Sequence, residues 1–167
     1  MSADRSPPTR RQRLGAYAVL VRDGNVLLTQ LSDSTSAAGR WTLPGGGVAH
    51  GEDPRDAVVR EVHEETGLHI DAGALLDCTS VHFEGISPDG VREDYHGVRL
   101  VYAGTIPADA PPPRVVELGG TTVAVGWHPV SDVWSGSLDT VDLVSAGLEM
   151  LGRALTTTAA GADVSAG

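Results

Sequence analysis

Apolar positions fall into short runs separated by turn-forming residues, a pattern typical of a domain rich in β-strands. Residues 14–22 and 25–31 are two such runs, and Asp23-Gly24 between them is a strong signal for a two-residue hairpin. Further extended segments are predicted at residues 68–70, 75–84, 97–106, 115–118 and 121–127. The connections at 32–39, 88–90 and 108–113 are rich in small polar residues, glycine or proline.

Helical patterns are predicted at residues 54–66, 131–134 and 138–155. The first has clear boundaries, because Asp53 is a good N-cap and Pro54 suits the first helical position. Gly67 stands where a left-handed C-terminal cap is expected. Val58 and Val62 form an apolar stripe along this helix, which we expect to face the core.

The order of these elements predicts an α/β fold: an α/β/α sandwich built on a mixed β-sheet. The chain has 167 residues, which suggests a single domain with one core. We expect a disordered N-terminal arm at 1–13, the folded domain at 14–155 and a flexible C-terminal tail at 156–167. The arm is interpreted as solvated, with contact of Arg10, Arg11 and Arg13 to a nucleic acid or a phosphate as the alternative.

Glutamates gather beside the apolar stripe of the first helix. Glu61, Glu64 and Glu65 lie within one turn, where like charges repel one another. Solvation relieves this repulsion on an exposed face, and a solvated acidic face is therefore the simpler interpretation. A hard cation such as Mg²⁺ relieves it more strongly, with Glu52 just before the helix as a further ligand. Arg60 lies one turn before Glu64 and is placed to orient that carboxylate.

A glycine run at 45–47 leads into the helix and allows close approach of the backbone to a ligand. Together these residues resemble the Nudix box of the Nudix hydrolase (MutT-like) family, G-x5-E-x7-R-E-U-x-E-E-x-G-U, where U is a bulky apolar residue. Its fixed positions are all filled here, by Gly46, Glu52, Arg60, Glu61, Val62, Glu64, Glu65, Gly67 and Leu68. The resemblance implies a Nudix-type sandwich over roughly residues 14–155.

The resemblance also implies a reaction. Nudix hydrolases cleave a nucleoside diphosphate linked to another group, X, into a nucleoside monophosphate and phosphorylated X, or pyrophosphate when X is phosphate. The expected cofactor is Mg²⁺, with Mn²⁺ as a substitute. The family roles imply metal ligands at Gly45 (through its carbonyl), Glu52, Glu61, Glu64 and Glu65.

The expected catalytic residues are Glu61 and Glu64, with Arg60 holding Glu64 by a charge-assisted hydrogen bond. Glu61 is the first candidate for the general base. Some Nudix enzymes place the base on a loop outside the box, and the acidic candidates for that position are Glu84, Glu93, Asp94 and Glu117. Each of these also suits an ordinary surface position.

Substrate selection is expected to come from outside the box. Aromatic residues are only 4% of the chain, so the candidates for stacking are few. The predicted substrate contacts are Arg40, Trp41, Tyr17, Phe83 and Tyr95, with His82 as a further candidate. For Trp41 a core anchor is the favoured interpretation and a base platform the alternative, and Trp127 is interpreted as core.

The charge balance restricts the partners. A net charge of −10 argues against a general nucleic-acid-binding surface, although a phosphorylated small molecule remains compatible through bridging cations. The chain has no lysine, so a direct phosphate clamp must use arginine. No apolar run is long enough to span a bilayer. A lone cysteine and the lack of a signal peptide favour a cytoplasmic location, and analogy with the family suggests a homodimer.

Two other functional classes compete with the hydrolase. A Nudix-fold module that senses or binds a nucleotide without turnover is the main alternative, but such modules often lack box carboxylates that are all present here. Isomerisation of an isoprenoid diphosphate needs a catalytic cysteine in the pocket. Cys78 is the only cysteine, and we expect it to be buried as a small apolar residue.

Overall fold

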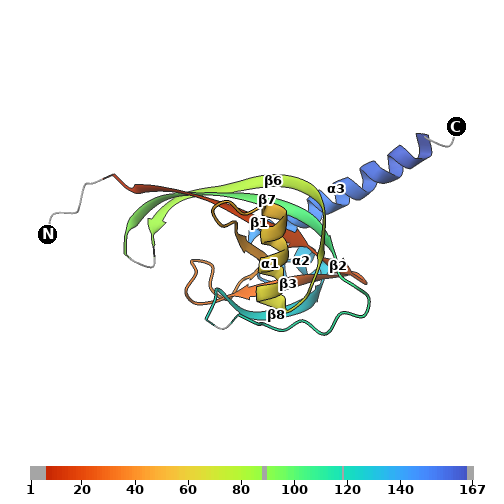
Figure 1. Cartoon of the computed structure of the whole chain (residues 1–167), viewed down its shortest axis with the longest axis horizontal. Coiled ribbons are helices and arrows are strands. Elements are labelled where there is room, and N and C mark those ends of the chain that lie inside the picture. The colour runs from red at the N-terminus through yellow and green to blue at the C-terminus, as the bar shows by residue number, and fades with distance from the viewer. Residues whose placement is uncertain (1–6, 88–89, 118, 165–167) are drawn as a thin grey trace.

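The computed structural model describes residues 7–87, 90–117 and 119–164. The strands in chain order are β1 (Thr9–Val19), β2 (Val21–Arg22), β3 (Asn25–Leu31), β4 (Trp41–Thr42), β5 (Gly45–Gly47), β6 (Asp71–Ile86), β7 (Arg92–Thr105) and β8 (Thr122–Pro129). The helices are α1 (Pro54–Thr66), α2 (Val130–Ser135) and α3 (Asp142–Val164) (Figure 1). No helix within the described ranges has both the length and the apolar character needed to cross a bilayer.

The strands form two four-stranded sheets. The first has the order β5-β1-β7-β6, in which β1 and β7 are parallel and the outer pairs are antiparallel. In the second, β3 pairs with β2 and β4 and also with β8. The predicted hairpin between β2 and β3 is confirmed, with Asp23 at φ 49° and Gly24 at φ 74°. The predicted mixed sheet is also confirmed, because the first sheet contains both parallel and antiparallel pairs.

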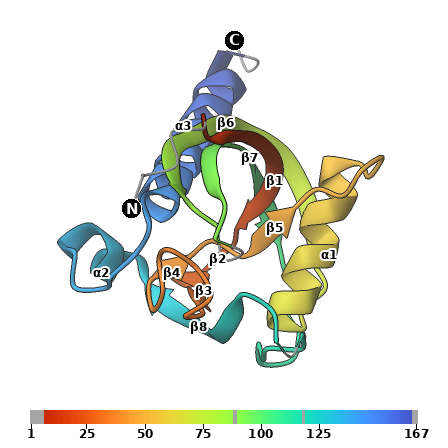
Figure 2. The ribbon, with the colours of Figure 1, turned by 90° about the vertical axis from the view of Figure 1, so that its left-hand side faces the viewer.

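Alternation along the strands divides the core into two clusters. Ala16 and Ala18 of β1 pack in the cluster that contains Val58 and Val62 of α1. Val19, the residue after Ala18, points to the other face of the strand and packs instead in the cluster that contains residues of α2 and α3. Helix α1 thus covers one side of the sheets and α2 with α3 the other (Figure 2), which confirms the predicted α/β/α fold.

The first sheet continues as a three-stranded arm beyond the rest of the fold (Figure 1). Its strands are β1, β6 and β7, and β1 pairs with β7 from Thr9↔Glu93 onward. The prediction of a disordered segment at 1–13 is therefore wrong for residues 9–13, and residues 1–6 lie outside the described part. Backbone pairing with a distant hairpin orders this segment, helped by an Arg11–Glu93 ion pair of 2.8 Å.

Three other expectations need correction. Helix α3 runs to Val164, where a flexible tail from 156 was predicted, and the alanines of this segment favour that continuation. Cys78 is exposed rather than buried, because it lies on β6, the outermost strand of its sheet. Residues 115–117 form no strand, and Leu118 lies outside the described part. Their backbone instead meets the end of α1, where the Glu117 N–H donates to the Glu64 carbonyl at 2.9 Å.

The long hairpin also differs in extent from the prediction. Strand β6 runs from Asp71 to Ile86, longer at both ends than the predicted segment at 75–84, and register shifts near Leu75 interrupt its pairing with β7. The extended segment predicted at 68–70 forms no strand and leads from α1 into β6. Of the predicted turn at 88–90, only Gly90 is described, and its N–H donates to the Ser87 carbonyl at 2.8 Å. Strand β7 correspondingly begins at Arg92, before the predicted position 97.

Candidate active site on helix α1

Helix α1 begins and ends at the residues that the sequence predicts. The Asp53 carboxylate accepts a hydrogen bond from the Arg55 N–H at 2.8 Å, and Pro54 occupies the first turn. Gly67 ends the helix in the left-handed region at φ 69°, and its N–H donates to the His63 carbonyl. These local signals fix where α1 begins and ends, and therefore which of its side chains face the glycine strand β5.

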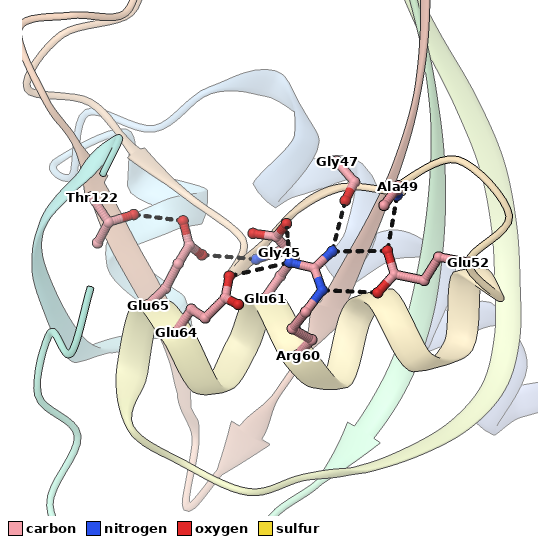
Figure 3. Close-up of polar contacts among 9 residues, drawn as sticks. All are labelled: Gly45, Gly47, Ala49, Glu52, Arg60, Glu61, Glu64, Glu65 and Thr122. Atoms are coloured by element: carbon pink, nitrogen blue, oxygen red, sulfur yellow. Dashed lines mark hydrogen bonds and ion pairs between the residues drawn. The ribbon is translucent and has the colours of Figure 1, made fainter. Parts of the chain in front are cut away.

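Arg60 is the centre of a charged cluster at this surface (Figure 3). Its guanidinium donates two bonds to Glu52, from Nε at 2.8 Å and from a terminal nitrogen at 2.9 Å. It also donates to Glu61 at 2.8 Å and to Glu64 at 3.1 Å. A further bond, at 3.1 Å, reaches the Gly47 carbonyl of β5. Arg60 therefore positions Glu64 as predicted, and it also connects the helix, the loop before it and β5.

Glu65 points away from Arg60 into the protein, with only 7% of its surface exposed. The Gly45 N–H donates to one of its oxygens at 2.9 Å, and the Thr122 hydroxyl donates to the other at 2.6 Å. Gly45 thus contacts the cluster through its N–H, whereas the sequence suggested its carbonyl as a metal ligand. Thr122 begins β8 and is far away in the chain.

The carboxylates have different electrostatic environments. The Arg60 hydrogen bonds lower the pKa of Glu52 to about 2. Burial raises the pKa of Glu61, despite its bond to Arg60. Burial also raises the pKa of Glu65 to about 7, against the opposing effect of the bonds from Thr122 and Gly45. The negative charge of Glu117 adds to the increase at both Glu61 and Glu65. Burial is therefore the main reason that the pKa values of Glu61 and Glu65 lie above the ordinary value of a glutamate.

The glycines of β5 allow this close packing. A Cβ on Gly46 would lie 2.3 Å from a carboxylate oxygen of Glu61, so a side chain there would displace that carboxylate. Gly45 has φ 140°, and a Cβ there would lie 2.3 Å from the Ala16 carbonyl oxygen. Gly45 is therefore required by the backbone, whereas Gly46 leaves the space that the Glu61 carboxylate occupies.

The donor set fits a hard cation in its chemistry. The glutamates of the cluster offer carboxylate oxygens, which hard cations prefer, and burial, which raises the pKa of Glu61 and Glu65, disfavours their charged forms when no cation is near. Within residues 7–87, 90–117 and 119–164, however, no three His, Cys, Asp or Glu side chains are already arranged to hold a metal ion. Arg60 bonds to Glu52, Glu61 and Glu64, and Glu65 is turned toward Thr122. Metal binding would require these side chains to reorient.

Comparison with known proteins identifies the family. The NUDIX domain model matches residues 11–146. The chain belongs to the NUDIX family. A solved structure of a MutT NUDIX hydrolase from Burkholderia pseudomallei is 31% identical, with a TM-score of 0.62, and the match covers 84% of this chain and 98% of that one.

Two curated relatives match over shorter segments at higher identity. The RNA pyrophosphohydrolase of Sphingopyxis alaskensis is 46% identical over 56 residues, and the CTP pyrophosphohydrolase of Escherichia coli is 41% identical over 59 residues. These segments cover 34% and 35% of this chain, and only 32% and 44% of the relatives.

The structure separates the four acids considered as a general base outside the NUDIX box. Glu84, Glu93 and Asp94 lie on the arm, where each is paired with an arginine or a histidine. Glu117 lies in the segment that meets the end of α1, and its charge acts on Glu61 and Glu65. Glu117 is therefore the loop acid that the fold brings to the NUDIX carboxylates.

Three of the predicted substrate contacts lie on the first sheet: Tyr17 near the glycine strand, and Phe83 and Tyr95 on the arm. Tyr17 of β1 lies opposite Gly45 of β5, and burial raises the pKa of its hydroxyl to about 12. Phe83 and Tyr95 are neighbours on the arm, with ring centroids 5.2 Å apart. His82 belongs to the opposite face of the arm, where it bonds to Asp94 at 2.5 Å.

Arg40 and Trp41 lie elsewhere. Arg40 is paired with Asp139 at 3.1 Å and donates to the Thr140 carbonyl, in the segment before α3. Trp41 packs against the α3-side core, edge-on to His128 at 4.2 Å between ring centroids. No contact found among the described residues joins either side chain to the NUDIX carboxylates. The core interpretation of Trp41 is therefore the better one.

Two features of the site were missed from the sequence. Thr122 was placed in a strand but given no role, and nothing in its local sequence points to Glu65. The arginines Arg13 and Arg99 were not assigned to the site either. Strand alternation was the available signal for them, because Arg13 and Arg99 share a face of the first sheet with Tyr17 and Tyr95.

Proposed function

We propose that this protein is a Mg²⁺-dependent hydrolase that cleaves the diphosphate linkage of a nucleoside diphosphate bonded to a group X. The products are a nucleoside monophosphate and phosphorylated X, or pyrophosphate when X is phosphate. Membership of the NUDIX family supports the reaction class. The matched curated relatives are pyrophosphohydrolases by name, of RNA and of CTP.

The observation that carries the proposal is the complete cluster around Arg60. One guanidinium orders three glutamates, while a fourth, Glu65, is held by Gly45 and Thr122. Such a dense set of carboxylates costs folding free energy through burial and mutual repulsion. A bound cation would offset that cost. A dense carboxylate cluster is therefore expected at a catalytic metal site rather than in a structural ion pair.

Each residue then has a defined task. Glu61, Glu64 and Glu65, with Glu52 in support, would hold Mg²⁺, which when bound would offset the charge of the diphosphate and make a water more acidic. Glu61 accepts the proton of the attacking water as general base, with Glu117 as the alternative. The water oxygen bonds to phosphorus as the bridging P–O bond breaks, and the electron pair leaves on the departing phosphate. Arg60 keeps the carboxylates in position.

The arm supplies the surface for the nucleoside. Phe83 and Tyr95 border a cavity of about 530 Å³, together with the polar loop residues Ser34, Thr35 and Ser36. Phe83 is 44% exposed, which is unusual for its residue type and leaves a ring face free for a base. We propose that the base stacks here.

A substrate panel tests the proposal. Nucleoside triphosphates, ADP-ribose, nucleotide sugars and dinucleoside polyphosphates would be assayed with Mg²⁺ and with Mn²⁺, and products identified by ³¹P NMR. We expect metal-dependent release of a nucleoside monophosphate from at least one member. Reaction in H₂¹⁸O should place one ¹⁸O atom in one of the phosphate products.

The matched control is Glu64→Gln, which keeps the shape of the side chain but removes its charge. Full turnover in this variant would contradict the assigned site. Tight binding of one panel member by the wild type, without turnover under any metal, would favour the nucleotide-sensing module instead.

A further inference from the structure

Two arginines on the first sheet have no acidic partner among the described residues. Arg13 of β1 and Arg99 of β7 form no side-chain hydrogen bond or ion pair with any other residue in the part of the chain that the structure describes. The Nε of Arg99 is buried and unpartnered. The chain holds 22 acidic residues against 12 basic ones, so unpaired cations are unexpected. A buried guanidinium nitrogen without an acceptor costs free energy, which a bound acceptor would recover.

Both arginines face one cavity. In the register of β1 and β7, Arg13 lies opposite Gly97 and Gly15 lies opposite Arg99, so the two side chains share a face of the sheet. The cavity has a volume of about 270 Å³, and its lining includes both arginines, Tyr17, Tyr95 and Gly47.

Two glycines make room for the tyrosine rings. A Cβ on Gly15 would lie 2.9 Å from the Tyr17 ring, and a Cβ on Gly97 would lie 3.0 Å from the Tyr95 ring. Each ring therefore lies back along its own strand, over the glycine two residues away. The two hydroxyl groups are brought to the same cavity as the guanidinium groups, which gives it donors from four side chains.

The cavity adjoins the active site. A terminal nitrogen of Arg13 is 4.0 Å from the position a Cβ would take on Gly47, and the Gly47 carbonyl accepts a hydrogen bond from Arg60. On its other side the cavity shares Arg13 and Tyr95 with the larger cavity beside Phe83. It therefore lies between the proposed base-stacking surface and the carboxylate cluster.

We propose that this cavity binds a phosphate group of the nucleotide, with Arg99 and Arg13 as its cationic donors and Tyr17 as a neutral one. The inference rests on the proposed function and adds a contact that does not depend on a metal. Arginine binds phosphate through two parallel N–H donors, which matches the free Nε of Arg99. The protein is thus expected to recognise the nucleotide by its phosphate as well as by its base.

Binding without metal tests this inference. The four common ribonucleoside 5′-monophosphates and the matching nucleosides would be titrated into the full chain in EDTA by calorimetry. We expect at least one monophosphate to bind about tenfold or more tightly than its nucleoside, since a charge-assisted bidentate contact is worth that much. Arg99→Gln should remove most of this preference and leave nucleoside binding unchanged.

Arg13→Gln is the second variant, at an exposed position where folding is not at risk. The matched control is Arg10→Gln, which removes the same charge from the same strand but on the opposite face, where Arg10 is 92% exposed. We expect this control to keep the monophosphate preference.

Three results would overturn the inference. One is equal binding of monophosphate and nucleoside by the wild type. Another is an equal loss of affinity in the Arg13 and Arg10 variants, which would indicate only general charge attraction. The third is binding of inorganic phosphate as tightly as the monophosphate, which would make this a site for the free anion. Because no metal or turnover is involved, these outcomes are independent of whether the carboxylate cluster is catalytic.

Discussion

The buried carboxylate of Glu65 makes a measurable contribution to stability that depends on pH. Its two oxygens accept bonds from the Gly45 N–H and the Thr122 hydroxyl. A glutamine fits the same position, because its oxygen accepts from Gly45 and its amide donates to the Thr122 oxygen. Glu65→Gln therefore removes the titration and keeps the contacts.

The size of the effect follows from the pKa of Glu65, which burial raises from 4.5 to about 7. The folded protein binds this proton more tightly than the unfolded chain does. The stabilising contribution is therefore complete below pH 4.5 and is lost as the pH rises through about 7. Between pH 5 and pH 8 the loss amounts to roughly 2.5 kcal/mol, at about 1.4 kcal/mol for each pH unit in the titrating range.

Urea unfolding in EDTA at several pH values measures this directly. The free energy of unfolding of Glu65→Gln relative to the wild type should rise by about 2.5 kcal/mol from pH 5 to pH 8. Glu149→Gln, at an exposed position on α3, is the control and should show no such trend. Parallel pH dependence of the wild type and Glu65→Gln would refute the burial of an ionisable Glu65.

Three further changes address the remaining contacts of the site. Arg60→Gln leaves three carboxylates unordered and should lower kcat by about 100-fold or more with Mg²⁺, since small misplacements are costly in catalysis. Gly46→Ala places a Cβ 2.3 Å from an oxygen of Glu61, and steady-state assays should show at least a roughly tenfold loss of kcat while circular dichroism shows a native fold. Thr122→Val removes a bond that lowers the pKa of Glu65, so the acid limb of the kcat/KM profile should move to higher pH. The same variant should lose about 1–2 kcal/mol of stability in urea unfolding.

Controls for these variants come from α3. Arg153→Gln, Gly152→Ala and Thr158→Val make the same chemical changes, or a closely similar one, at exposed positions away from the NUDIX residues. Each should retain wild-type kcat and an unchanged pH profile. A control as impaired as its active-site counterpart would show that the loss reflects the substitution type, and the assigned contact would then be wrong.

The parts of the molecule that were predicted correctly are those with local signals. Helix α1 was predicted with its exact bounds, because Asp53, Pro54 and Gly67 specify its ends through short-range contacts. The pairing of Arg60 with Glu64 followed from helical spacing alone. In these cases the partners lie within a few turns of one another.

The parts that were missed depend on partners far away in the chain. Residues 9–13 carry no strand signal of their own, and β7 orders them by backbone pairing. The bond from Thr122 to Glu65 joins residues 57 positions apart, and Glu117 reaches the cluster from an irregular segment. Arg40 looked available beside the glycine loop, but Asp139 neutralises it. Single-sequence reasoning lacks the tertiary contacts that decide such positions.

The place of β1 in its sheet constrains how the chain folds. Strand β1 is flanked by β5 and β7, and its ion pair from Arg11 to Glu93 joins residues 82 positions apart. Parallel pairing over such a separation closes a long loop. The chain loses conformational entropy in closing this loop before the contacts between the strands can offset the loss. During synthesis, residues 9–13 of β1 therefore lack their strand partner until residues 93–97 of β7 have left the ribosome.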